Sequence, residues 1–229
     1  MEQAYRVARE RALMPIEDQL IFLLKAVPVT LSISALAFLL GFPLGVLLAV
    51  LRLYGGRALR ALAEAYEKVF RSVPVLAVML FFYFGVGGYV HAFKDPYFTS
   101  VMSLGLISAA NQSQIFRSAI GSVGRSQMLA ALSLGLTTWK AVRHVILPQA
   151  LIAALPALGS EIALLIKDSS YSFIIGVMEL MKHADILRAA TRSPVLPYLA
   201  AALIYVALTF PLANYLDRRG TRMKRKLGL

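Results

Sequence analysis

Long blocks of apolar residues dominate this sequence and limit what it can fold into. A helix needs about 20 such residues to cross the hydrocarbon core of a bilayer. The blocks lie at about residues 20–51, 69–90, 98–120, 149–166 and 195–216. Only 16% of the 229 residues are charged, compared with about a quarter in soluble domains. The sequence therefore predicts an all-α integral membrane protein with about five transmembrane helices.

Basic residues collect beside these blocks and predict the orientation of the chain in the membrane. They lie in the turn at 52–57, in the segment 124–148 and in the C-terminal tail, 218–229. Because cytoplasmic loops are rich in Lys and Arg, we expect all three on the cytoplasmic side. Five spans then leave an interfacial N-terminal segment, 1–18, outside, followed by a transmembrane domain at 19–217. Three basic residues that fall outside are exceptions to the rule: Lys182, Arg188 and Arg192.

Several polar side chains interrupt the third and fourth apolar blocks. Polar groups are costly in hydrocarbon, so we expect Asn111 and Gln114 to face the bundle interior or a water-filled path. They are also good candidates for hydrogen bonds between helices, and this role is the more common one. Glu161 has two interpretations that the sequence leaves open. It lines a solute path and favours a cationic solute, or it forms an ion pair that orients two helices.

The segment 124–148 predicts a short helix–turn–helix outside the bilayer. Ser126 is a good N-cap, residues 127–134 favour a helix, and Gly135 suits the left-handed position that ends it. Thr137 or Thr138 then caps a second helix, which Pro148 ends or kinks. Four apolar side chains and two small ones would be exposed on this segment: Met128, Leu129, Leu132, Leu134, Ala130 and Ala131. An exposed apolar surface indicates a docking site, although a helix lying flat in the membrane interface fits equally well.

The spacing within this segment resembles the cytoplasmic coupling loop of ABC importer permeases. The family pattern is Glu-Ala-Ala, three residues, Gly, nine residues, Ile, one residue and Leu-Pro. The matching positions are Ala130, Ala131, Gly135, Val145, Leu147 and Pro148. Leu129 stands where the family usually has Glu, which removes one charge from the docking face.

Further motifs, in register over residues 20–218, resemble the polar amino acid branch of this family. The second-span motifs are Phe70–Pro74 and Phe81–Gly85, and Ile115–Ile120 matches the end of the third span. The later matches are Leu147–Ala150, Leu155–Pro156, Lys167–Ser170 and Ile175–Gly176. By this resemblance Lys167, Asp168, Ser169 and Ser170 lie near the inner solute pathway, although Lys167 and Asp168 also fit a local charge pair.

The resemblance implies a type I importer fold in a prokaryotic inner membrane and a set of partners. A second permease subunit, identical or homologous, completes the pathway, and an extracytoplasmic binding protein delivers the solute. Two ATPase subunits dock on the coupling segment, through Ser126, Met128, Leu129, Ala130, Ala131, Leu134 and Gly135. The sequence has no G-x-x-x-x-G-K phosphate loop, so ATP and Mg²⁺ are expected on the partner ATPase, and this chain is not expected to be an enzyme.

Two other classes of function fit the sequence less well than the importer. A channel or ion-coupled carrier for a small polar solute would need no ATPase, but inverted internal repeats are not evident. A simple membrane anchor would not need five spans with polar interiors. No catalytic or metal site is expected, because the three histidines are widely separated and cysteine is absent.

Overall fold

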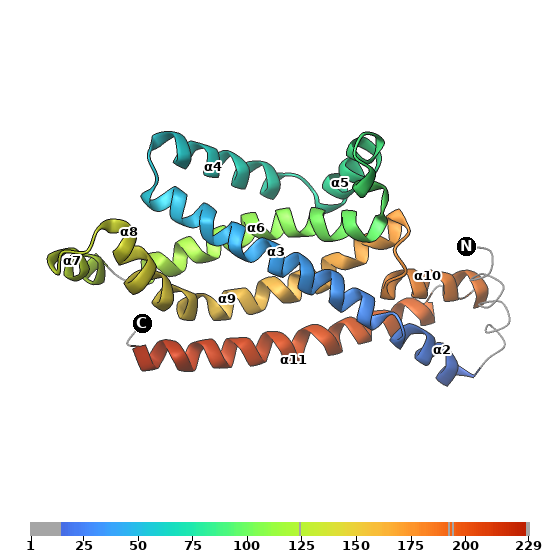
Figure 1. Cartoon of the computed structure of the whole chain (residues 1–229). Coiled ribbons are helices and arrows are strands. Elements are labelled where there is room, and N and C mark those ends of the chain that lie inside the picture. Colours follow the sequence, from blue (N-terminus) through green and yellow to red (C-terminus); the bar gives the residue numbers. More distant parts are fainter. Residues whose placement is uncertain (1–14, 124, 192, 194, 228–229) are drawn as a thin grey trace. The chain divides into compact units, whose positions relative to one another are not determined.

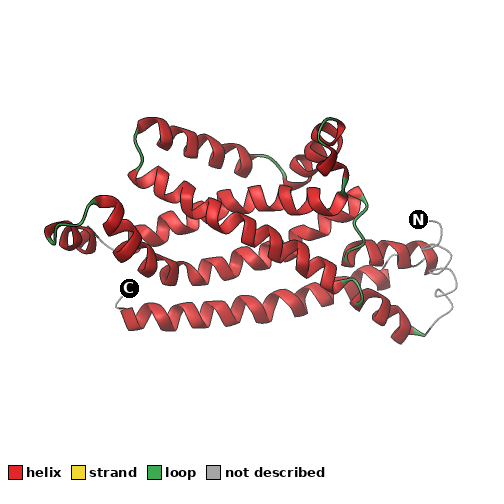
Figure 2. Cartoon of the chain, in the orientation of Figure 1, coloured by secondary structure: helices red, strands yellow, loops and turns green. Residues whose placement is uncertain are grey.

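The computed structural model describes residues 15–123, 125–191, 193 and 195–227, and the regular elements among them are all helical (Figures 1 and 2). The α-helices are α2 (Ile16–Leu24), α3 (Val27–Tyr54), α4 (Arg57–Ser72), α5 (Val75–Leu80), α6 (Pro96–Ser122), α7 (Arg125–Ser133), α8 (Thr138–Ala141), α9 (Leu147–Asp168), α10 (Leu180–Thr191) and α11 (Val195–Leu227). Two π-helical turns lie at Phe81–Gly85 and Val142–Ile146, and 3₁₀ segments lie at Val86–Gly88, His91–Lys94 and Ser169–Ile175.

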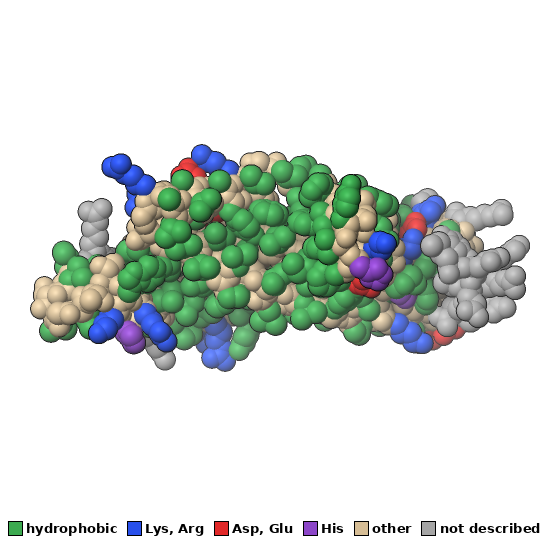
Figure 3. Space-filling view, turned by 45° about the horizontal axis from the view of Figure 1, so that its top comes forward, with side chains coloured by type: hydrophobic (Ala, Val, Ile, Leu, Met, Phe, Trp, Pro, Cys, Tyr) green, Lys and Arg blue, Asp and Glu red, His purple; other side chains and the backbone are tan. Residues whose placement is uncertain are grey.

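Three segments of the described chain are long and apolar enough to cross a membrane. They are Ile16–Tyr54, Thr138–Ile175 and Val195–Lys224. A fourth candidate is a broken pair, Arg57–Ser72 with Val75–Gly88, which bends by 103°. Hydrophobic side chains cover most of the face seen in Figure 3, as expected for a protein that contacts lipid. The prediction of a membrane protein with several helical spans is therefore confirmed. A total of five spans is reached only if the broken pair and α6 each count as one span.

Helix α6 has 27 residues and is long enough to span, but its composition is more polar than that of the three apolar segments. Ser, Asn and Gln residues recur along it, and many of them are buried. The fully buried polar residues of α6 are Thr99, Ser100, Ser103, Ser108, Gln112 and Ser113. This span thus directs many polar groups inward, whereas Asn111 and Gln114, the two residues named above, are only partly buried.

The chain divides into two compact units, each built from three stretches of sequence. Unit 1 comprises residues 1–37, 74–105 and 164–210, and unit 2 comprises residues 38–73, 106–163 and 211–229. Helices α3, α6, α9 and α11 each contribute one segment to each unit.

In unit 2, glycines allow helices to approach closely. A Cβ atom on Gly45 of α3 would lie 2.8 Å from the Cβ of Gln112 on α6. A Cβ on Gly220 of α11 would lie 2.5 Å from the Cδ of Pro156 on α9. Such contacts are typical of helix pairs in membranes, where small residues let backbones meet. The first apolar block contains Gly41, Pro43 and Gly45, and α3 runs through all three without a break.

The main core of unit 2 joins α3, α6 and α9 through alternating large and small side chains. Phe116 is fully buried there, and its ring meets the ring of Phe42 edge-on at a centroid distance of 5.2 Å. Ala150, Ala153 and Ala154 of α9 complete this core. The basic tail expected at 218–229 belongs, as far as Leu227, to the helix α11.

In unit 1, α10 is held against the first and last spans. Leu23, Leu180, Ala184 and Leu187 form its apolar core with Ala201. The backbone N–H of Leu180 donates to the hydroxyl of Thr30 at 3.1 Å. The expected N-terminal segment, 1–18, lies largely outside the described residues, and the described chain enters α2 at Ile16.

Candidate functional site

The first candidate site is the segment from α7 to α8 in unit 2. Gly135 adopts the left-handed conformation, with φ of 79°, as predicted. The N–H of Gly135 donates to the carbonyl of Leu132 at 2.9 Å, and the N–H of Leu136 donates to that of Ala131 at 3.2 Å. These two bonds form a Schellman motif, which satisfies the last carbonyls of α7 and ends the helix sharply.

The start of this segment differs from the prediction. Helix α7 begins at Arg125, so Ser126 lies inside its first turn as an exposed residue and is not the N-cap. Thr137 occupies the N-cap position of α8, but its side chain makes no capping hydrogen bond. Pro148 does not end the second helix, because helical backbone continues through it from α8 to α9, after the π-helical turn at Val142–Ile146.

The apolar side chains of this segment divide into an exposed set and a packed set. Leu129 is 63% exposed, Leu132 40% and Leu134 82%. Met128 packs against the unit 2 core, and Ala131 is only 3% exposed. Ala130 is exposed, so it is the one of the two alanines that another surface can contact directly. We call the exposed set, Leu129, Ala130, Leu132 and Leu134, the α7 ridge.

The second candidate site surrounds Glu161 of α9, also in unit 2. This carboxylate is 6% exposed, and its Oε1 accepts a hydrogen bond from the hydroxyl of Ser108 at 2.7 Å. The amide of Asn111 donates to the same oxygen at 3.5 Å. The amide nitrogen of Gln112 donates to Ser108 Oγ at 2.9 Å and to the carbonyl of Phe38 at 3.2 Å. The Oε1 atom of Gln112 is buried and has no hydrogen-bond partner among the described residues. A network of hydrogen bonds thus joins α3, α6 and α9 at a buried carboxylate.

The other predicted pathway residues do not join this network. Gln114 donates its amide to Glu67 of α4, in a separate polar cluster. Lys167, Asp168, Ser169 and Ser170 belong to unit 1. Within that run, Lys167 is exposed, and the buried hydroxyl of Ser169 donates to the carbonyl of Ile166 at 2.8 Å.

Sequence reasoning missed the cluster around Glu67 and the role of Ser108. Glu67 is 2% exposed and accepts hydrogen bonds from Arg52, from Gln114 and, at 2.6 Å, from the hydroxyl of Ser113. An available signal was the polar repeat on α6, where Ser108, Asn111 and Gln114 follow one another at intervals of three residues. Residues at such intervals lie on one side of a helix.

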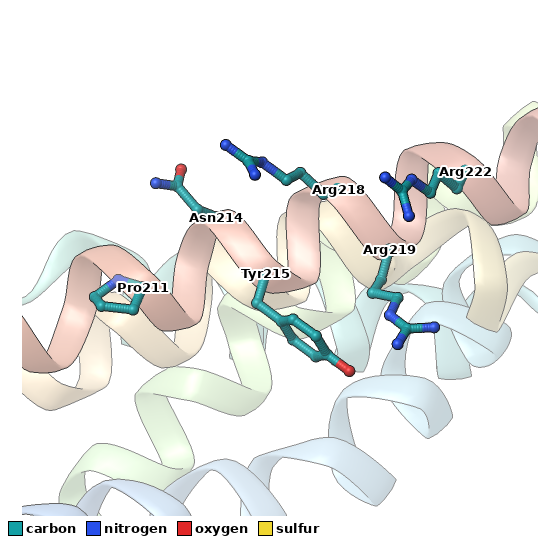
Figure 4. Close-up of a pocket in the computed structure, with 6 residues that line it drawn as sticks. All are labelled: Pro211, Asn214, Tyr215, Arg218, Arg219 and Arg222. Carbon is teal, nitrogen blue, oxygen red and sulfur yellow. The ribbon is translucent and has the colours of Figure 1, made fainter.

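A basic hollow of about 460 Å³ lies along the last part of α11 (Figure 4). The described residues that line it all come from this helix: Pro211, Asn214, Tyr215, Arg218, Arg219 and Arg222. The guanidinium of Arg219 lies 5.3 Å from the ring centroid of Tyr215, in a cation–π contact. Arginines at the end of a spanning helix are suited to bind anionic headgroups.

Comparisons with known proteins agree with this architecture. The chain is 36% identical over 197 residues to the nopaline transport system permease protein NocM of Agrobacterium fabrum, which covers 82% of each chain. It is 32% identical over 208 residues to the glutamate/aspartate import permease protein GltK of Escherichia coli, covering 86% of this chain and 93% of that one. A crystal structure of an amino acid ABC transporter with histidines superposes with a TM-score of 0.79 at 30% identity, over 88% of this chain and 94% of that one.

The family match includes both candidate sites. Residues 41–225 match the family described as the binding-protein-dependent transport system inner membrane component. This range includes the α7 ridge, the side chains of the Glu161 network and most of the apolar spans. The chain therefore belongs to this family of inner membrane transport permeases.

Proposed function

We propose that this chain is the membrane-spanning permease subunit of an ATP-driven importer for a polar amino acid. The observation that carries the proposal is the α7 ridge, an exposed apolar surface on a helix with a defined end. A membrane subunit that binds no ATP needs such a rigid contact to sense the ATPase. Relatives named as nopaline, glutamine and glutamate/aspartate permeases support amino acids as the solute class.

Membership of the family supports a set of partners for this subunit. Two ATPase subunits, which carry ATP and Mg²⁺, dock on the ridge and its flanking residues, from Ser126 to Gly135. A second permease subunit completes the pathway, and an extracytoplasmic binding protein delivers the solute. ATP-driven closure of the ATPase pair moves α7 as a lever, and the bundle alternates between inward-open and outward-open states. Coupling of this kind requires an element with two discrete positions.

Charge supports an orientation with the C-terminus in the cytoplasm and the N-terminus outside. Unit 2 holds 15 of the 24 Lys and Arg residues and only 4 of the 12 Asp and Glu residues. Unit 1 holds the other 9 basic and 8 acidic residues, so it is close to neutral. The positive-inside rule therefore assigns the loops of unit 2, including α7, to the cytoplasm.

The Glu161 network is the best candidate for a solute contact within this subunit. A buried carboxylate is costly in a membrane unless it is paired or functional. Ser108 and Asn111 donate to it, and the nearby Oε1 of Gln112 is a second acceptor for a donor group. These acceptors suit the ammonium or guanidinium group of an amino acid.

Uptake into proteoliposomes tests the proposal. The chain is reconstituted with its ATPase, supplied with binding protein, and tested with a panel of cationic, neutral and acidic amino acids. We expect accumulation against a gradient that requires ATP. Equilibration without accumulation, or purification without any ATPase, would favour an ATP-independent carrier.

A further inference from the structure

A basic pocket in unit 2 lies between α3, α4 and α6. It encloses about 390 Å³ and is lined by four cationic side chains: Arg52 of α3, Lys68 and Arg71 of α4, and Arg117 of α6. Among the described residues that line it, Glu67 is the one carboxylate, beside Gln114. We call this the arginine pocket. Neither membership of the family nor the proposed role of Glu161 gives this pocket a function.

The floor of the pocket is held by Glu67, which positions two of the surrounding side chains. Its carboxylate binds the guanidinium of Arg52 directly. It also accepts from Gln114, whose own Oε1 accepts from the guanidinium of Arg117. Arg117 is thus held in place through an amide rather than through a carboxylate. Side chains that are fixed in this way lose little entropy when a ligand binds.

The pocket has more positive charge than its acids neutralise. Arg52 pairs with Glu67, and Lys68 pairs with Glu64 at 3.0 Å. Within the described residues, neither Arg71 nor Arg117 has a carboxylate within 4.0 Å. Two guanidinium groups from two helices therefore remain for an anion. Guanidinium groups match carboxylate and phosphate oxygens in bidentate geometry.

The pattern of α4 argues for a water-soluble anion rather than a lipid headgroup. Leu59, Leu62 and Val69 are 46%, 68% and 57% exposed and form an apolar stripe along one side of α4. At 100° per residue, Lys68 and Arg71 project from the other side of the helix. If the stripe meets lipid, the pocket opens away from lipid.

We propose that the arginine pocket binds the carboxylate of the transported solute on the cytoplasmic side of the Glu161 network. Ser108 and Asn111 bind Glu161, while Gln114 and Arg117 line the pocket, so one polar side of α6 leads from an acidic site to a basic one. Each end matches one charged group of an amino acid. This inference rests on the proposed function for the identity of the solute, but not for the binding of an anion.

Anion binding is measured directly on the purified chain, without transport. The thermal unfolding midpoint is followed in lipid nanodiscs with acetate, with inorganic phosphate, and with chloride at equal ionic strength. Wild type is compared with Arg71→Gln, because the side chain of Arg71 makes no hydrogen bond or ion pair with the described residues and its loss should not unfold the protein. The matched control is Arg57→Gln, an exposed position on α4 outside the pocket.

We expect acetate to stabilise wild type and Arg57→Gln, with an apparent affinity about tenfold weaker or worse in Arg71→Gln, since a hydrogen bond to a charged group contributes about 1.5–3 kcal/mol. Equal acetate affinity in all three proteins would overturn the proposal. Stabilisation by inorganic phosphate but not by acetate would also overturn it, as would an Arg71-dependent effect seen only with phosphatidylglycerol vesicles. If the wild-type protein binds acetate in an Arg71-dependent way but the reconstituted transporter takes up no amino acid, the proposed function is contradicted and the anion site is still supported.

Discussion

The two units of this protein differ in net charge, although four helices contribute residues to both. Unit 2 has a large excess of basic residues, whereas unit 1 is nearly balanced. Each unit buries a carboxylate outside the Glu161 network. Glu67 in unit 2 is satisfied by a guanidinium, a hydroxyl and an amide. Glu179 in unit 1 accepts from the N–H groups of Met181 and Lys182, at the start of α10, and from the hydroxyl of Tyr205.

We infer from this difference that unit 2 carries the sites for partners and solute, whereas the buried carboxylate of unit 1 stabilises the fold. Unit 2 contains the α7 ridge, the Glu161 network and the arginine pocket. The carboxylate of Glu179 is fully buried and caps a helix, so its role in unit 1 is structural. Matched changes in the two units should therefore have different effects.

The largest effect is expected from Ala130→Arg on the α7 ridge. A long charged side chain at this exposed position should block the apolar contact with the ATPase, because burying an unpaired charge is costly. We expect ATP-driven uptake to fall more than tenfold and the ATPase to be lost on purification. The matched change in unit 1 is Ala189→Arg, at an exposed position of α10, and it should leave ATPase copurification intact. Equal behaviour of the two variants would remove the functional distinction between the units.

Gly45→Leu should be the next largest effect, this time on folding. Its Cβ would lie 2.8 Å from Gln112 Cβ and 3.1 Å from the carbonyl oxygen of Ala109, so α3 and α6 would have to separate. Overpacking of this kind typically costs about 1–3 kcal/mol. Gly88→Leu in unit 1 is the control, because nothing lies within 4 Å of a Cβ there. Monodisperse yield and thermal midpoint in detergent measure both, and a stable Gly45→Leu protein would mean that the helix contact is not close.

Glu161→Gln should change the choice of solute with little effect on the fold. The amide keeps an acceptor for Ser108 but removes the negative charge. We expect the KM for cationic amino acids to rise about tenfold relative to neutral ones, as for the loss of a charge-assisted hydrogen bond. Glu179→Gln, the same change in unit 1, should leave the preference unaltered. An unchanged preference in Glu161→Gln would leave that carboxylate a structural role only.

The smallest effect is a pH dependence of unit 1. Burial raises the pKa of Glu179 to about 7, against the opposing effect of its backbone hydrogen bonds. Because the folded state binds this proton more tightly than the unfolded state, the stabilisation is complete below about pH 4.5 and is lost as pH rises through about 7. From pH 6 to pH 8 the free energy of unfolding should fall by on the order of 1 kcal/mol. Thermal midpoints of Glu179→Gln should lack this decline, and an equal slope in both proteins would assign it to other groups.

The sequence alone predicted those parts of the fold that depend on residues close together in the chain. The stop at Gly135 followed from its need for positive φ, and the apolar spans followed from composition. The expected end of the second helix at Pro148 was wrong, because a π-helical turn at Val142–Ile146 precedes the proline and helical backbone continues into α9. The start of α7 differed by a short distance, which is common at helix ends.

The partners of the buried carboxylates could not be predicted from sequence. Glu67 and Ser113 are 46 residues apart, and Glu161 and Ser108 are 53 apart. Which polar residue meets which depends on how α3, α4, α6 and α9 pack, and glycine contacts set that packing. For the same reason Gln114 and Asn111, one helical turn apart, bind different carboxylates.

Site-specific cross-linking tests the central claim, that unit 2 meets the ATPase through α7. The chain has no cysteine, so one introduced thiol is unique. Ser126→Cys, exposed on α7, is compared with Ala92→Cys, exposed in unit 1, using a short thiol-to-amine reagent on the assembled transporter. The account predicts a covalent adduct between Ser126→Cys and the ATPase, and none from Ala92→Cys. An adduct from Ala92→Cys with none from Ser126→Cys would contradict it.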